Sequence, residues 1–130
     1  LLLKYLDAEE ILSLQVHPND EQAVQLEGAG QVGKTEAWHI LEAAEDARLI
    51  AGVKPGAAPE AFARSVRDGT ILEQVQYVPV KSGDTVFMPA GTVHALGAGL
   101  LVYKVQQNSD VTYRVFDWNR PLTAGRVLHI

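Results

Sequence analysis

The sequence predicts an all-β fold, either a sandwich or a barrel, formed by one compact domain. Short runs rich in Leu, Ile and Val recur along the chain at close spacing, and turn residues such as Gly, Pro, Asn and Asp separate them. Many short strands at such spacing are typical of sandwiches and barrels. The 130 residues are enough for one hydrophobic core and contain no repeat or linker, so we expect a single domain over residues 1–130.

The strand pattern recurs in segments that end at turn signals. Pro18-Asn19-Asp20 follows one such segment, and Lys81-Ser82-Gly83 and Pro89-Ala90-Gly91 enclose another. The expected strands are residues 1–6, 11–17, 36–42, 48–53, 76–80, 85–88, 100–106 and 112–118.

One segment follows a helical pattern instead. Pro59 stands where a first helical turn would begin, and apolar residues such as Phe62 and Val66 follow at roughly helical spacing. Gly69 interrupts the segment, so two short helices are expected rather than a single long one. We interpret this as a short helical insertion around residues 59–75 that decorates the β-fold.

The composition excludes several classes of function. The net charge is −5 and no Lys/Arg cluster is present, so no nucleic-acid partner is expected. No apolar run reaches the ~18 to 20 residues of a membrane span, so no membrane partner is expected either. The chain has no cysteine, which excludes disulfides, thiolate metal sites and cysteine nucleophiles. Any metal must therefore be held by nitrogen and oxygen atoms.

The cellular location follows only indirectly from the sequence. No signal peptide is visible, so we expect a cytoplasmic protein. The chain begins at Leu1 rather than at Met, which leaves open that it is a fragment of a longer chain.

The first candidate pair of polar residues lies in the segment Leu14-Gln15-Val16-His17. Side chains two residues apart share one face of a strand, so Gln15 and His17 point together and away from their apolar neighbours. If the apolar residues pack outward, the polar pair faces a barrel interior, where both side chains need partners. A single histidine at a strand end is more often a hydrogen-bonded structural residue than a ligand, so both interpretations stay open.

Glu36 opens an apolar strand and has the same parity as Trp38 and Ile40. A carboxylate at this parity is costly to bury unless it is paired or bound to a cation. Lys34 shares the parity as well, so an ion pair between Lys34 and Glu36 is the alternative to a metal site. These two residues alone do not decide between the two.

The most specific pattern lies in residues 83–94, which carry the letters GDTVFMPAGTVH. Gly83 permits a tight entry into a short strand, and Pro89 and Gly91 supply a reversal of the chain. The reversal returns the chain so that His94 projects into the barrel from the adjacent strand. A chance match to the whole pattern is improbable, so the functional interpretation is preferred here.

This pattern is the second signature motif of the cupin superfamily, and together with the other segments it resembles the type I mannose-6-phosphate isomerases. The resemblance implies a cupin jelly-roll barrel. The matching stretches, in the order of the family, are LLLKYLDAEEILSLQVHPND at 1–20, GKTEAWHIL at 33–41, GDTVFMPAGTVHAL at 83–96 and VQQNSDVTYRVFDWNR at 105–120.

The resemblance implies one zinc ion. Two imidazoles and a carboxylate are ordinary zinc ligands, and an amide oxygen is a weaker fourth. Nitrogen and oxygen donors of this kind do not exclude Mn, Fe, Co or Ni, so other divalent metals stay open. The implied metal ligands are Gln15, His17, Glu36 and His94.

The resemblance also implies an activity, the metal-dependent interconversion of mannose 6-phosphate and fructose 6-phosphate through a cis-enediol. A metal polarises the carbonyl and hydroxyl oxygens while charge develops on them. A sugar phosphate also calls for cations, and the catalytic candidates are Lys34 and Arg114, which match the Lys and Arg of the family motifs. For Arg114, an ion pair with Asp110 or Asp117 is the alternative.

Two departures from the family support a second hypothesis. Many relatives have Glu where this chain has Lys104, and family members usually carry further segments on both sides. The alternative is therefore a non-catalytic, metal-containing cupin that binds a sugar phosphate as a regulatory or incomplete domain. A metal-dependent oxygenase is a third hypothesis, but those enzymes commonly have His at the position of Gln15.

Other polar and aromatic residues have weaker claims to function. His39 lies on the outer strand face, and His129 lies close to the terminus, so we expect both near the surface. Trp38 and Trp118 are expected in the core, and residues 106–110 look like a strand end and a turn. Cupin barrels often pair through their edges, so a homodimer stays open.

Overall fold

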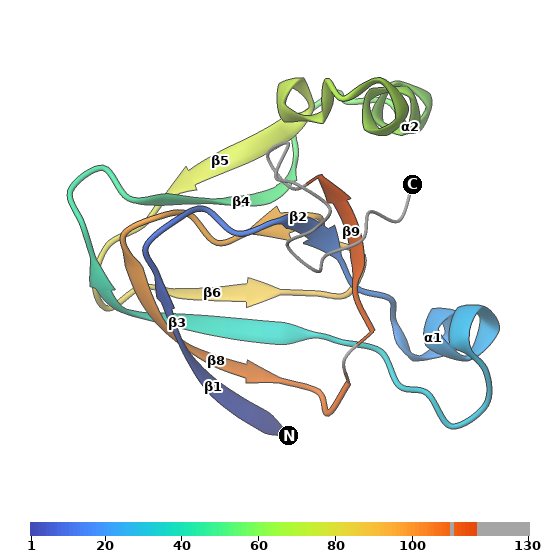
Figure 1. Ribbon diagram of the computed structural model, residues 1–130, viewed down its shortest axis with the longest axis horizontal. Coiled ribbons are helices and arrows are strands. Elements are labelled where there is room, and N and C mark those ends of the chain that lie inside the picture. The colour runs from blue at the N-terminus through green and yellow to red at the C-terminus, as the bar shows by residue number, and fades with distance from the viewer. Residues whose placement is uncertain (110, 117–130) are drawn as a thin grey trace.

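Two antiparallel sheets form the body of the protein, as the computed structural model of residues 1–109 and 111–116 shows (Figure 1). The strands are β1 (Leu2–Ala8), β2 (Leu14–Val16), β3 (Glu36–Ala43), β4 (Arg48–Val53), β5 (Val75–Pro79), β6 (Thr85–Met88), β7 (His94–Ala95), β8 (Leu100–Gln106) and β9 (Tyr113–Phe116). The first sheet has the order β1-β8-β3-β6, and the second has the order β5-β4-β7-β2-β9. This is the architecture of a cupin sandwich, so the predicted fold class is confirmed.

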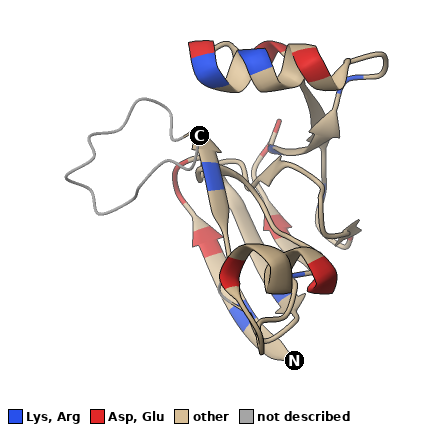
Figure 2. Ribbon diagram, turned by 90° about the vertical axis from the view of Figure 1, so that its right-hand side faces the viewer, with Lys and Arg blue, Asp and Glu red and all other residues tan. Residues whose placement is uncertain are grey.

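The predicted helical insertion is present and is divided as expected. It consists of α2 (Pro59–Asp68) and the 3₁₀-helix η1 (Ile71–Glu73), and α2 ends at Gly69. Apolar residues of both helices pack on the second sheet, and Figure 1 shows α2 beyond β4 and β5. The exposed residues of α2 include Glu60, Arg64, Arg67 and Asp68, so acidic and basic segments of its ribbon both appear in Figure 2.

A second helix, α1 (Asp20–Glu27), was not expected, since the flanking segments were interpreted only as turns. Its start is a capping box, in which Asn19 Oδ1 accepts from the Gln22 N–H at 2.8 Å and Gln22 Oε1 accepts from the Asn19 N–H at 3.0 Å. Only Ala23 of this helix is buried, so the helix has little apolar periodicity by which to detect it.

The inner face of the first sheet changes from apolar to polar along its strands, and this change places the site. On β3, Ile40 stands opposite Val102 of β8, whereas the next inward pair brings Trp38 opposite Lys104. The last pair is Glu36 and Gln106. The inward residues of β8 are all buried: Leu100, Val102, Lys104 and Gln106.

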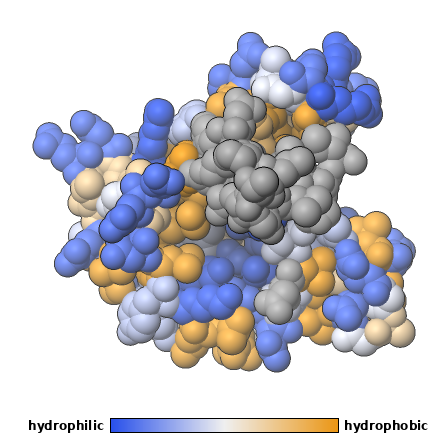
Figure 3. Space-filling model, viewed as in Figure 1, coloured by the Kyte–Doolittle hydropathy of each residue, from blue (hydrophilic) through white to orange (hydrophobic). Residues whose placement is uncertain are grey.

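The surface of the described part is mixed in hydropathy, with hydrophilic side chains gathered over α2 at the upper right of Figure 3. Apolar side chains are exposed on the outer face of the first sheet, namely Leu3, Tyr5 and Phe87. No helix of the described part is both long and apolar enough to cross a membrane.

A close backbone approach at Gly33 ties the segment after β2 to the segment before β3. A Cβ at Gly33 would lie 2.5 Å from the backbone carbon of Asn19, so only glycine fits. The Gly33 N–H donates to Asp20 Oδ1 at 2.8 Å, and the next N–H, of Lys34, donates to the Pro18 carbonyl at 2.9 Å. These contacts hold His17 and Glu36 in neighbouring positions.

We expect Gly33→Ala to lower the free energy of unfolding by about 1 to 3 kcal/mol, because the backbone must move apart to accept the methyl group. Chemical denaturation monitored by tryptophan fluorescence measures this change. Gln31→Ala, an exposed change in the same loop, is the matched control and is expected to alter stability by less than about 0.5 kcal/mol. Equal stability of the two variants would contradict the close approach.

Candidate metal centre

β2 and the residue after it, β3 and β7 supply the residues of the candidate site. The predicted turn before His94 is present, but it carries the chain from β6 in the first sheet to β7 in the second, so His94 does not come from a strand adjacent to β6 as expected. Gln15 of β2 stands directly opposite His94 of β7, so their side chains share a face. Thr92 N–H donates to the Pro89 carbonyl at 3.2 Å, which closes the turn before β7. The N–H of Gly91, whose φ is 87°, donates to the His17 carbonyl at 2.8 Å and joins the turn to the end of β2.

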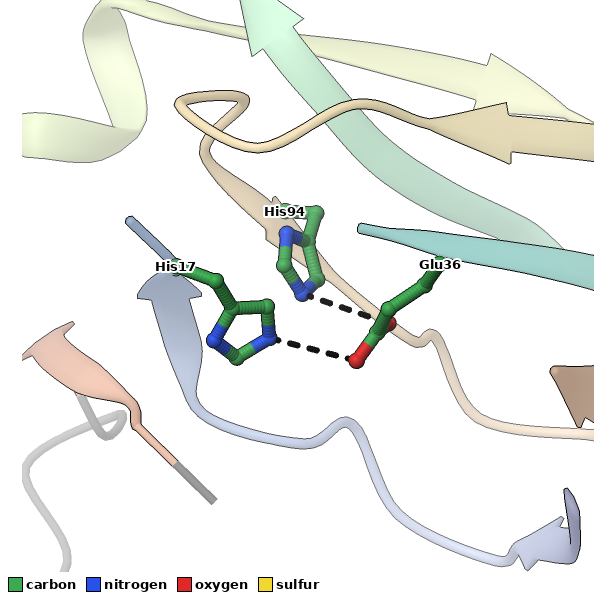
Figure 4. Close-up of side chains that lie close together, drawn as sticks. All are labelled: His17, Glu36 and His94. Carbon is green, nitrogen blue, oxygen red and sulfur yellow. Dashed lines mark ion pairs between the residues drawn. The ribbon is translucent and has the colours of Figure 1, made fainter. Parts of the chain in front are cut away.

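His17, Glu36 and His94 converge inside the sandwich, as Figure 4 shows. His17 Nε2 lies 3.3 Å from Glu36 Oε1, and His94 Nε2 lies 3.9 Å from Glu36 Oε2. One ligand atom from each of the three residues lies within 4.8 Å of the others. Ligand atoms about 2.1 Å from a tetrahedral zinc ion are about 3.4 Å apart, so this spacing suits a single ion. All three residues are at most 2% exposed.

The hydrogen bonds of the two imidazoles determine which nitrogen carries a proton. His17 Nδ1 lies 3.1 Å from the Val111 carbonyl, and His94 Nδ1 lies 2.9 Å from the Thr92 carbonyl. A carbonyl oxygen only accepts, so each Nδ1 must donate. In a neutral imidazole this leaves a lone pair on Nε2, and both Nε2 atoms are directed at Glu36. Metal-binding histidines are commonly oriented by this kind of hydrogen bond.

The donor set fits a cation. His17 Nε2, His94 Nε2 and Glu36 Oε1 have no hydrogen-bond partner among the described residues, although all are buried. Two lone pairs directed at a carboxylate repel it unless a cation lies between them or an imidazole takes a second proton. A divalent metal satisfies all three atoms at once, and unpartnered polar atoms at such depth are otherwise costly.

Glu36 is the most strongly stabilised charge of the site. Burial alone would raise the pKa of its carboxyl, but without a metal a hydrogen bond from His17, which requires the second proton on that imidazole, and the charge of Lys104 outweigh burial and lower this pKa to about 2. The indole N–H of Trp38 donates to Glu36 Oε2 at 2.8 Å. Glu36 is therefore ionised at neutral pH and fixed in orientation.

Two buried lysines contact the same oxygen of Glu36. Lys34 Nζ lies 3.7 Å and Lys104 Nζ 3.6 Å from Glu36 Oε1. The ion pair between Lys34 and Glu36 that the sequence left open is thus present, and it coexists with the two imidazoles. Lys104 faces the site, and burial lowers the pKa of its ammonium group despite the charge of Glu36.

Gln15 and Arg114 lie beside the three converging residues. Gln15 is half-buried, shares the face of His94 and stands opposite Arg114 of β9. Arg114 Nε donates to the buried Ser13 hydroxyl at 2.9 Å. The alternative partners of Arg114, Asp110 and Asp117, lie outside the described residues.

Three further residues need comment. His39 lies outside the site, as expected, with its Nδ1 2.9 Å from the Thr85 hydroxyl. Trp38 is in the core, as expected, but its contact with Glu36 and its edge-on packing against His94 were missed. Gln106 was expected merely as a strand end, but it is buried on the inner face of the sheet. Its even spacing from the apolar Val102 could have predicted this face from the sequence. His129 and Trp118 lie outside the described residues.

We expect Trp38→Phe to weaken metal binding by about tenfold or more, because the carboxylate loses the donor that orients it. The phenyl ring retains most of the packing, so a competition assay with a chromogenic chelator isolates the effect of the lost N–H. His39→Phe, at a neighbouring strand position on the other face, is the control and should leave the affinity unchanged. Unaltered affinity in Trp38→Phe would show that Glu36 needs no such support.

Acid is expected to destabilise the metal-free protein. Burial, reinforced by the charge of His17, lowers the pKa of His94 from 6.5 to about 4, so the unfolded chain binds this proton more readily than the folded chain. Stability from His94 is complete above about pH 6.5 and is lost towards pH 4, up to about 3 kcal/mol. The pKa of Glu36, lowered from 4.5 to about 2, extends the loss below pH 4.5.

Denaturation of the chelator-treated protein between pH 7 and pH 4 measures this loss. In His94→Gln the slope between pH 6.5 and 4 is expected to decrease by about one proton. A free energy of unfolding that stays constant or rises on acidification would refute the assignment of a neutral, buried His94.

The chain is similar to proteins named mannose-6-phosphate isomerase. No protein-family model matches the chain. It is 43% identical over 132 residues to the mannose-6-phosphate isomerase ManA of Bacillus subtilis. It is 44% identical to the probable mannose-6-phosphate isomerase GmuF of the same organism. Each match covers 100% of this chain and 41% of the relative.

Solved structures agree with the sequence matches. The mannose 6-phosphate isomerase from Bacillus subtilis matches with a TM-score of 0.89 at 40% identity, over 98% of this chain and 41% of that chain. A putative mannosephosphate isomerase from Archaeoglobus fulgidus matches with a TM-score of 0.71 at 26% identity, over 89% of this chain and 38% of that chain. The chain spans less than half the length of these relatives. Over its own length it is homologous to mannose-6-phosphate isomerases, so the resemblance seen in its motifs is confirmed.

Proposed function

We propose that this chain provides the metal site of an aldose–ketose isomerase that interconverts mannose 6-phosphate and fructose 6-phosphate. The observation that carries the proposal is the convergence of two imidazole lone pairs and one ionised carboxylate in a buried site. The names of relatives at 43% and 44% identity supply the substrate. Because the chain covers 41% of those relatives, the activity of the whole protein is part of the proposal.

We assign the metal as zinc, held by the predicted ligands Gln15, His17, Glu36 and His94. The neutral imidazoles and the carboxylate suit zinc, and the amide oxygen of Gln15 is a fourth donor on the face of His94. Bound in this way, a divalent cation supplies polarisation of the sugar oxygens.

In the proposed reaction a proton moves between C2 and C1 of the open-chain sugar through a cis-enediol, while hydroxyl and carbonyl exchange positions. No external oxidant or reductant is needed. The ammonium group of Lys34, 3.7 Å from Glu36, donates hydrogen bonds to the phosphate group or to the sugar oxygens that gain charge in the reaction. Arg114, opposite Gln15, adds a guanidinium group on the neighbouring strand.

Lys104 supports a second candidate function. Its ammonium group lies 3.6 Å from Glu36 Oε1, at the position where the family resemblance implies Glu. A cation there attracts an anionic ligand but supplies no carboxylate for proton transfer. The alternative is therefore a non-catalytic cupin that keeps the metal and binds a sugar phosphate.

Other features remain predictions of the sequence. These are the single domain, the homodimer, the cytoplasmic location and the lack of nucleic-acid and membrane partners. Gel filtration with light scattering tests the dimer directly.

The purified chain is expected to contain one equivalent of zinc and to convert mannose 6-phosphate, with activity lost after chelation. Metal content by mass spectrometry and a coupled assay for fructose 6-phosphate measure both. If only the Lys104→Glu variant converts mannose 6-phosphate, Lys104 in place of the family Glu is the reason that the wild-type chain is inactive. Metal without turnover in either protein would favour the binding function.

A matched pair of histidine variants separates the site from the rest of the fold. His94→Gln is expected to lose stoichiometric metal, whereas His39→Gln, which alters a residue on the outer face, is expected to keep it. A wild-type chain without stoichiometric metal would refute the site altogether.

A further inference from the structure

Gln106 is a buried polar residue to which the proposed function gives no role. It is 1% exposed, ends β8 and stands directly opposite Glu36 of β3. Residues opposite each other on antiparallel strands point to the same face with their Cβ atoms about 5 Å apart. Gln106 therefore belongs to the wall of the candidate metal centre.

Its amide group is fixed by two hydrogen bonds. Gln106 Nε2 donates to the Ser109 carbonyl at 3.0 Å and to the Gln107 carbonyl at 3.2 Å. Exchanging the amide nitrogen and oxygen would direct an oxygen at two carbonyl oxygens, so these contacts determine the orientation. The other end of the amide, Oε1, is consequently held in one direction.

Gln106 Oε1 has no hydrogen-bond partner in the described part of the chain. The buried side-chain atoms with this property there are His17 Nε2, Glu36 Oε1, His94 Nε2 and Gln106 Oε1. Three of the four belong to the converging residues, and the fourth belongs to the residue opposite Glu36. Buried acceptors without a hydrogen bond are costly, and Gln106 shares the inner face of the sheet with Glu36, so a ligand bound at the converging residues is the candidate partner of Gln106 Oε1.

The chemistry of Oε1 restricts what it binds. A neutral amide oxygen does not attract phosphate; it accepts a hydrogen bond from an O–H or N–H group or coordinates a cation. Because the four predicted ligands already give the metal four donors, we take the partner of Oε1 to be an O–H or N–H group. Two residues earlier on the same face, Lys104 supplies a cationic donor. The acceptor of Gln106 and the donor of Lys104 together suit a ligand with several neighbouring hydroxyl groups, each of which can donate and accept.

We propose that Gln106 is a substrate-binding residue whose Oε1 accepts a hydrogen bond from one hydroxyl group of the phosphorylated sugar. This inference rests on the proposed function, because it takes its ligand from there. It adds a role in selecting hydroxylated ligands, on a strand that supplies no predicted metal ligand.

The test uses a hexitol 6-phosphate, an unreactive open-chain probe, titrated calorimetrically into the zinc-loaded protein. Gln106→Met removes the acceptor at similar volume and is expected to weaken binding by about tenfold, with zinc affinity unchanged. Gln107→Met is the matched control, because Gln107 Oε1 already accepts from the Thr35 N–H at 2.9 Å. Its affinity for the probe is expected to stay within about twofold of the wild-type value.

Monodeoxy probes sharpen the test as a double-mutant cycle. One of them is expected to bind the wild type more weakly, with no further loss in Gln106→Met. Should Gln106→Met not fold, Gln106→Asn, which withdraws the oxygen by one methylene, is expected to show the same loss.

The remaining outcomes overturn the inference in distinguishable ways. Equal probe affinity in wild type and Gln106→Met would refute the proposed hydrogen bond. A further loss of affinity in Gln106→Met with every deoxy probe would refute it as well. A fall in zinc affinity would make Gln106 a metal ligand instead. A zinc-loaded wild type that binds no hexitol phosphate refutes the substrate class of the proposed function, and this inference falls with it.

Discussion

The buried carboxylate of Glu36 is the constraint on which the rest of the site depends. Removing an ionised carboxylate from water costs several kcal/mol even in a relaxed protein, so the surrounding structure must supply positive charge and donors. Lys34 and Lys104 lie 3.7 and 3.6 Å from Oε1, and each attraction is worth about 4 kcal/mol at an effective dielectric constant near 20. The Trp38 N–H satisfies Oε2. These contacts together keep the carboxyl group ionised without a metal.

The sheet register places this charge. Along β3 and β8 the inward pairs pass from Ile40 and Val102 to Glu36 and Gln106, so one end of the sandwich has an apolar core and the other has buried polar side chains. A shift of one residue in the register would turn every inward side chain outward. The apolar end therefore does more than stabilise the fold, because it fixes which face of β3 presents Glu36. His17 and His94 arrive from the second sheet, which packs on the same core.

Much of this arrangement follows from local patterns in the sequence. Parity alone put Lys34 and Glu36 on one face, and the turn before His94 was evident from its proline and glycine. Contacts between distant segments were not evident, because parity gives the face of a side chain but not its partner across the sheet. Lys104, Trp38 and Gln106 acquired their roles only through strand pairing. Helix α1 was missed for a different reason: its start is polar, and only Ala23 of it is buried.

The charges of the site also connect the metal to the proposed anionic ligand. Without a metal, Glu36 is balanced by Lys34 and Lys104, with burial lowering the pKa of Lys104. A divalent ion adds two positive charges to the same small volume. The two imidazoles are neutral when their Nε2 lone pairs are ligands, so Glu36 is the anionic group among the described residues of the site. The loaded site then has more cationic than anionic groups, a state that is costly when buried. An anion such as a sugar phosphate relieves this excess, so occupancy by metal and affinity for the anion increase together.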